Sequence, residues 1–111
     1  MSDQANTLLV DTWVWPGNLR PFIETVSRWI GYDFDDSDWS ALEYGLVGTD
    51  NDAGRWFTYP LVGDPILEMS VAQNVGDQPV SVRVGAPAGV RDDLRSRIRA
   101  AADIFNTFRV Q

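Results

Sequence analysis

The order of apolar and polar residues begins with a strand pattern and changes to a helix pattern. Residues 7–15 are rich in β-branched and aromatic types, which favours a strand, and a Pro-Gly pair beginning at Pro16 ends it. Apolar residues then recur at helical spacing over 19–30. Asn18 can cap the start of this helix, and Gly31 can end it. The sequence therefore predicts a strand followed directly by an amphipathic helix.

The second half of the chain alternates with a period of two residues, as half-buried strands do. Strands are expected over 55–62, 67–72 and 80–84. Residues of turn-forming types fill 49–54 and 74–78. Because the links between these strands are short, we expect them to pair as an antiparallel meander.

The segment after the acidic link carries two conflicting patterns. Alternating apolar residues from Leu42 favour a strand, whereas Ser40 and Glu43 have the spacing of a helix capping box. We expect a strand from about residue 42, with a turn of helix near 38–43 as the alternative.

A long helix is expected at the end of the chain. From Val90 to Phe108, apolar residues fall on one helical face, and arginines and aspartates occupy the other. The whole pattern predicts an α+β fold with an antiparallel sheet of four to five strands and two helices packed on one face. The 111 residues are enough for one domain, so a single globular domain over residues 1–111 is expected.

Charge and composition restrict the partners and the location. The net charge is −7, which disfavours direct binding to the phosphates of nucleic acid. The chain has no cysteine, no long apolar run and no secretory-signal pattern at its start. These features are typical of a cytoplasmic protein without a membrane segment.

Histidine, cysteine and lysine are all absent from the sequence. Their absence excludes Ser-His-Asp and Cys-His nucleophiles, zinc sites with nitrogen or sulfur ligands, and lysine chemistry. The acidic run from Asp33 fails as a calcium loop, because Asp38 stands where glycine is needed and Tyr44 where glutamate is needed. We therefore expect no catalytic residues, no metal and no cofactor. A carboxylate-based enzyme or small-ligand-binding domain using Tyr44 or Tyr59 is kept as an alternative.

The acidic segment around Trp39 is the predicted partner-binding surface. Its acidic rim would steer a basic partner, and the aromatic ring would supply buried area. The alternative is a loop that is simply solvated. The predicted partner-binding residues are Asp33, Asp35, Asp36, Asp38, Trp39, Asp50, Asp52, Arg55 and Trp56. The expected partner is another protein with a basic surface.

The stretch from Trp29 to Leu61 resembles small immunity proteins of bacterial polymorphic-toxin systems. The resembling elements are Arg28-Trp29 at a helix end, Asp38-Trp39, Glu43-Tyr44-Gly45, and Gly54-Arg55-Trp56 before a strand. The family's usual cysteine before the acidic turn is missing, and its strands are more polar than those of this chain. The resemblance implies a non-enzymatic bacterial protein that blocks the active site of a secreted toxin, often with an acidic surface against nucleases.

A second hypothesis is a dimeric secretion-type chaperone or adaptor. Such a protein would form a homodimer through an apolar helix or strand face. Trp13 and Trp15 are expected to share one strand face with Leu9 and Asp11, and this face is the candidate for self-association.

Overall fold

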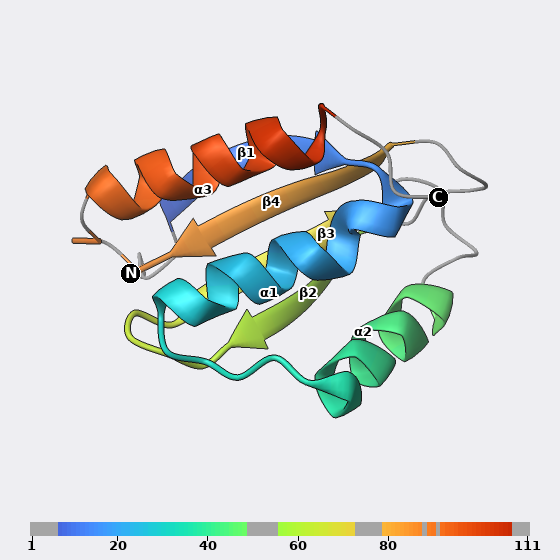
Figure 1. Cartoon of the computed structure of the whole chain (residues 1–111). Coiled ribbons are helices and arrows are strands. Elements are labelled where there is room, and N and C mark those ends of the chain that lie inside the picture. Colours follow the sequence, from blue (N-terminus) through green and yellow to red (C-terminus); the bar gives the residue numbers. More distant parts are fainter. Residues whose placement is uncertain (1–6, 49–55, 73–78, 88, 91, 108–111) are drawn as a thin grey trace.

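The computed structural model describes residues 7–48, 56–72, 79–87, 89–90 and 92–107. Its elements are β1 (Thr7–Val14), η1 (Pro16–Asn18), α1 (Leu19–Trp29), α2 (Asp36–Gly48), β2 (Trp56–Leu61), β3 (Leu67–Ala72), β4 (Val80–Ala86) and α3 (Asp92–Phe105). The four strands form one antiparallel sheet in the order β1-β4-β3-β2. Helices α1 and α3 lie over one face of this sheet, and α2 lies beside β2 (Figure 1). The predicted α+β fold is confirmed, with four strands and with three helices instead of two.

The strands β2, β3 and β4 form the predicted meander, and β1, the first strand of the chain, pairs with β4 at the edge of the sheet. The register of β1 shifts between Leu8 and Val10, and this bulge turns Leu9 into the core. Asp11 and Trp13 remain together on the other face, both exposed. The prediction that Leu9 shares their face is therefore wrong, because the bulge interrupts the alternation on which it was based.

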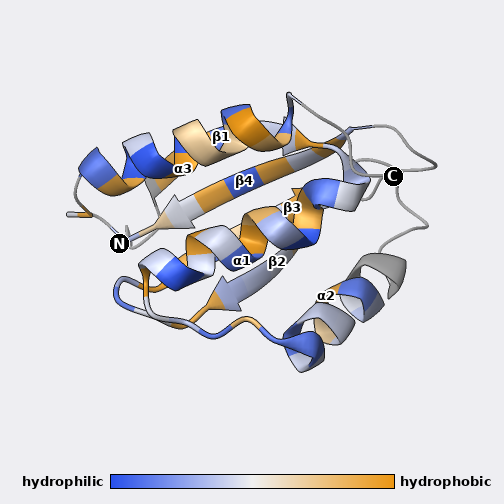
Figure 2. Ribbon diagram, in the orientation of Figure 1, coloured by the Kyte–Doolittle hydropathy of each residue, from blue (hydrophilic) through white to orange (hydrophobic). Residues whose placement is uncertain are grey.

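The core fills the space between the sheet and the helices. Figure 2 shows hydrophobic residues alternating with hydrophilic ones along β4, as a sheet with one buried face requires. The largest fully buried side chains are Phe22, Ile23, Leu42, Leu61, Leu67, Met69, Ile98, Val10, Val14, Val26, Val71 and Val82. They come from all four described strands and from α1, α2 and α3, and the edge strand β2 contributes only its last residue, Leu61.

Helices α1 and α3 run antiparallel (Figure 1). The start of α1 and the end of α3 are held together by side-chain contacts. The buried Asn18 donates a hydrogen bond from Nδ2 to the backbone oxygen of Phe105 at 2.8 Å. The rings of Phe22 and Phe105 meet edge to face at 6.1 Å. Asn18 precedes α1 as predicted, but its side chain makes no capping bond and links the two helices instead. Gly31, with a φ of 77°, follows the end of α1 as predicted.

The strand expected from residue 42 is wrong, because α2 occupies this segment. A reciprocal capping box starts the helix: Asp35 N–H donates to Asp38 Oδ2 at 3.0 Å, and Asp38 N–H donates to Asp35 Oδ1 at 3.1 Å. The box therefore lies five residues earlier than the Ser40 and Glu43 pair. On this helix Leu42 is fully buried.

Tertiary contact explains why α2 can approach β2 so closely. A Cβ atom added to Gly45 would lie 2.1 Å from Cζ of Phe57 on β2. Only glycine leaves room for the ring at this point of the helix. The Gly45–Phe57 contact thus fixes α2 against the edge of the sheet.

Candidate functional site

The acidic segment is organised around the carboxylate of Asp38. Its Oδ1 accepts hydrogen bonds from the Tyr32 hydroxyl at 2.5 Å and from the Tyr59 hydroxyl at 2.8 Å. Its Oδ2 accepts the backbone N–H of Asp35. One side chain on α2 therefore binds the link after α1, the start of its own helix and strand β2.

These hydrogen bonds change the ionisation of all three side chains. Burial by itself raises the pKa of Asp38, but the bonds donated by Tyr32, by the Asp35 N–H and by Tyr59 together lower it. Burial, followed by the hydrogen bond to Asp38, raises the pKa of Tyr32 and of Tyr59. Each tyrosine is thus stabilised as a neutral donor, and Asp38 is stabilised as the charged acceptor.

Aromatic rings pack beside this hydrogen-bonded cluster. Phe34 is buried and contacts Trp39 edge to face at 6.5 Å and Tyr59 at 6.2 Å. Trp39 is half-buried and packs against the hydrophobic core. The Trp39 ring, which was expected to supply buried area to a partner, also packs within the chain and helps to hold α2 in place.

Arg20 of α1 neutralises another part of the acidic segment. Its guanidinium bonds to Asp36 and, at 3.0 Å from Nε, to Glu24. These two hydrogen bonds raise the pKa of Arg20, that to Asp36 most. The guanidinium also lies 5.9 Å from the centre of the Trp39 ring.

The described members of the predicted partner-binding set are divided between two places. Asp33, Asp35, Asp36, Asp38 and Trp39 lie together on and before α2. Of these, Asp33 is exposed and makes no ion pair with any residue that the structure describes.

Of the other members of the set, only Trp56 is among the described residues. Asp50, Asp52 and Arg55 lie outside the described residues. Trp56 alternates with Phe57 on β2, so its ring lies on the face of the sheet opposite the core. Trp56 and Trp39 are consequently on different sides of the sheet.

One face of the sheet has no described helix over it, and we call it the open sheet face. Its members follow from the strand registers: Leu8, Asp11, Trp13, Trp56, Thr58, Glu68, Ser70, Ser81 and Arg83. Most of them are exposed, including Leu8 at 50% and Trp13 at 36%. Trp13 was expected on a shared strand face with Asp11, and it lies there. Trp13 and Trp56 belong to the two edge strands of the sheet, so only the strand pairing shows that they share a face.

Polar and aromatic side chains on the open sheet face contact one another. Arg83 lies 4.2 Å from the centre of the Trp56 ring, and its Nε is 3.7 Å from Asp11 Oδ2. Trp13 meets Trp15 edge to face at 5.3 Å. Arg83 therefore links β1 to β2 across the middle of the sheet.

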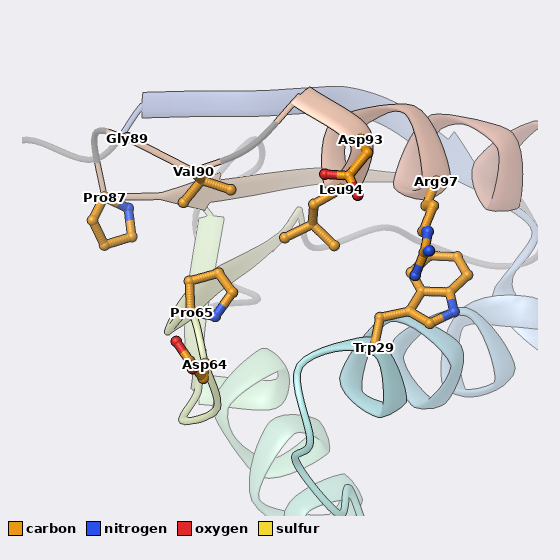
Figure 3. Close-up of a pocket in the computed structure, with 9 residues that line it drawn as sticks. All are labelled: Trp29, Asp64, Pro65, Pro87, Gly89, Val90, Asp93, Leu94 and Arg97. Carbon is orange, nitrogen blue, oxygen red and sulfur yellow. The ribbon is translucent and has the colours of Figure 1, made fainter.

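A pocket of about 470 Å³ lies on the helical side of the molecule. Its wall comes from the end of α1, the β2–β3 turn, the segment after β4 and the first turns of α3 (Figure 3). The lining residues are Trp29, Asp64, Pro65, Pro87, Gly89, Val90, Asp93, Leu94 and Arg97. The acids that line it, Asp64 and Asp93, are exposed.

The described ranges contain neither a cluster of metal ligands nor a membrane-spanning helix. No three His, Cys, Asp or Glu side chains within them gather closely enough to hold a metal ion. None of the described helices has both the length and the apolar character needed to cross a bilayer.

Comparison with protein-family models, with curated proteins and with solved structures gives no match in any of the three cases. Function therefore has to be inferred from the residues of this chain.

Proposed function

We propose that this domain works by binding another protein and that the open sheet face is its docking surface. The observation that carries the proposal is the placement of Trp13, Trp56 and Arg83 together on a face without a described helix. Tryptophan and arginine are the residues most enriched among those that dominate binding energies at protein interfaces. A sheet face in contact with water typically carries polar side chains, and both tryptophans depart from that pattern.

The internal bonds of the acidic segment favour a supporting role for it. Asp35, Asp36 and Asp38 already have partners within the chain, and a docking protein would have to replace those bonds. The net charge of −7 still attracts a basic partner over longer distances. We therefore propose that the acids raise the association rate and that the open sheet face supplies the buried contact.

An immunity or inhibitor protein is the specific role that we propose, with the product of a neighbouring gene as the toxin. Small size, net acidity and the absence of histidine, cysteine and lysine support a non-enzymatic cytoplasmic role. The test is co-expression with the neighbouring gene product, scored by growth and by isolation of a complex. If no complex forms and the cell is not protected, the proposed inhibitor role is refuted.

The docking surface has its own test, in which two exposed apolar side chains are compared. Trp13→Ser removes a ring from the open sheet face, and Ile104→Ser removes an exposed side chain from α3 as the matched control. We expect Trp13→Ser to weaken binding about tenfold or more, as loss of a hot-spot side chain does. The affinity of each variant for the neighbouring gene product is measured by calorimetric titration. Equal affinities of the two variants would overturn the assignment of the surface.

A dimeric chaperone or adaptor is a second candidate that one observation favours. The open sheet face carries both Asp11 and Arg83, so a two-fold-related copy could place an acid opposite an arginine. Sedimentation at micromolar concentration distinguishes this role. A monomer would rule it out, and a dimer broken by Trp13→Ser would favour it over the inhibitor.

A further inference from the structure

The pocket on the helical side lies between the end of α1 and the first turns of α3. The bonds through Phe105 hold the other end of this helix pair. At the pocket end, Trp29 of α1 faces Leu94 and Arg97 of α3 across the cavity (Figure 3). A volume of about 470 Å³ is within the range, roughly 300–1,000 Å³, of sites for small organic molecules.

A backbone hydrogen bond holds the β2–β3 turn, which forms one wall of the pocket, against the end of α1. The N–H of Asp64 donates to the backbone oxygen of Ile30 at 2.9 Å, which ties the β2–β3 turn to the end of α1. A Cβ atom on Gly63 would lie 2.3 Å from the same oxygen, so the turn approaches α1 as closely as a glycine permits. The distance between the two walls is thereby set by the fold.

The pocket combines an apolar middle with three charged side chains, Asp93 and Arg97 from α3 and Asp64 from the β2–β3 turn. Its apolar surface comes from Trp29, Val90 and Leu94, together with two prolines. Figure 3 shows Arg97 reaching from α3 toward Trp29, with Asp64 at the opposite end. Neither the Arg97 guanidinium nor the Asp64 carboxylate has a hydrogen bond or an ion pair to the residues that the structure describes. Both groups are therefore free to bind a ligand.

We propose that this pocket binds a short apolar peptide with free ends, of about two residues. Its carboxylate would pair with Arg97, whose planar guanidinium suits a carboxylate, and its ammonium group would pair with Asp64. Its apolar side chains would lie against Trp29 and Leu94. A single amino acid carries both charges on one Cα, whereas an extended dipeptide separates them by about 7 Å. A dipeptide can therefore place one charge on each side of an apolar middle.

This site is independent of the proposed docking surface. The pocket lies among the helices and the β2–β3 turn, whereas the open sheet face is on the other side of the sheet. Loss of one function by mutation should leave the other intact.

Calorimetric titration of the full chain with the dipeptide leucyl-phenylalanine tests the proposal. We expect saturable binding with a Kd of about 1 mM or lower. N-acetyl-leucyl-phenylalanine lacks the ammonium charge and leucyl-phenylalanine amide lacks the carboxylate, and each should bind about tenfold more weakly. Absence of saturable binding, or equal binding of all three compounds, would overturn the proposal.

Matched variants locate the site on the protein. Arg97→Gln and Asp64→Asn should each weaken dipeptide binding about tenfold, one for each charge pair. Arg95→Gln is the control, because Arg95 is an exposed arginine of the same helix that does not line the pocket. Unchanged affinity in both pocket variants, or an equal loss in the control, would refute the assignment. A negative result here does not affect the Trp13 test of the docking surface.

Discussion

Removing the hydroxyl groups that bind Asp38 tests how α2 is held to the sheet. Tyr59→Phe deletes one donor at 2.8 Å and leaves the aromatic packing in place. A hydrogen bond to a charged group contributes about 1.5–3 kcal/mol when it is well buried. Because Tyr59 is only half-buried, we expect a loss of about 1 kcal/mol in the free energy of unfolding. For a domain of this size that loss lowers the Tm by about 4 °C.

The same network predicts how stability depends on pH. Asp38 has a lowered pKa in the folded state, so its contribution is fully present above its unfolded pKa, near 3.8. The contribution is lost as the pH falls through the lower, folded value. For Tyr32 and Tyr59 the folded pKa is raised. Their contribution is present below pH 10 and is lost as the pH rises through the folded values.

Urea denaturation at neutral and acidic pH measures both effects. The double variant Tyr32→Phe, Tyr59→Phe should be less stable at neutral pH and should lose less additional stability below pH 3.8 than the parent protein. Tyr44→Phe is the control, because Tyr44 is 83% exposed. Equal stabilities of the Tyr59→Phe and Tyr44→Phe variants, or parallel acid profiles of the parent and the double variant, would refute the role given to Asp38.

Three further substitutions test the packing of the helices by thermal melting. Gly45→Ala gains about 1 kcal/mol of helix propensity, but its Cβ would lie 2.1 Å from Phe57. Overpacking costs about 1–3 kcal/mol, so we expect Gly45→Ala to lower the free energy of unfolding. The additional substitution Phe57→Leu should restore part of this loss. A Gly45→Ala protein that is more stable than the parent would contradict the Gly45–Phe57 contact. Ser27→Ala should raise the free energy of unfolding by about 1 kcal/mol, because the buried Ser27 hydroxyl has no partner among the described residues; a loss of stability would show a missed bond. Asn18→Ala should cost about 1–3 kcal/mol, because it leaves the Phe105 carbonyl without this donor; an unchanged Tm would mean that the bond contributes nothing.

Most of the secondary structure could be predicted because its signals are local. The alternation over β2, β3 and β4 and the helical spacing over α1 and α3 identify each element without knowledge of its neighbours. The short links between strands also predicted their antiparallel pairing. These elements are confirmed at nearly the predicted bounds.

The segment of α2 could not be predicted in the same way. Apolar alternation from Leu42 is compatible with a strand, and the choice depends on partners elsewhere in the chain. The capping pair of Asp35 and Asp38 starts the helix, and the space at Gly45 lets it pack on Phe57. The sequence contained the capping spacing, but several acids and serines nearby offered similar spacings.

The candidate sites depend even more strongly on tertiary structure. Composition alone establishes that histidine, cysteine and lysine chemistry is absent, because no folding can supply a missing side chain. Whether an acid is exposed or internally bonded depends on residues distant in the chain, as Asp38 shows with Tyr59 and Asp36 with Arg20. Trp13 and Trp56 share a face only because burial of the apolar strand faces fixes the pairing across the sheet. The residue types and their local periods thus determined the elements and the excluded chemistry, and long-range packing decided which side chains meet.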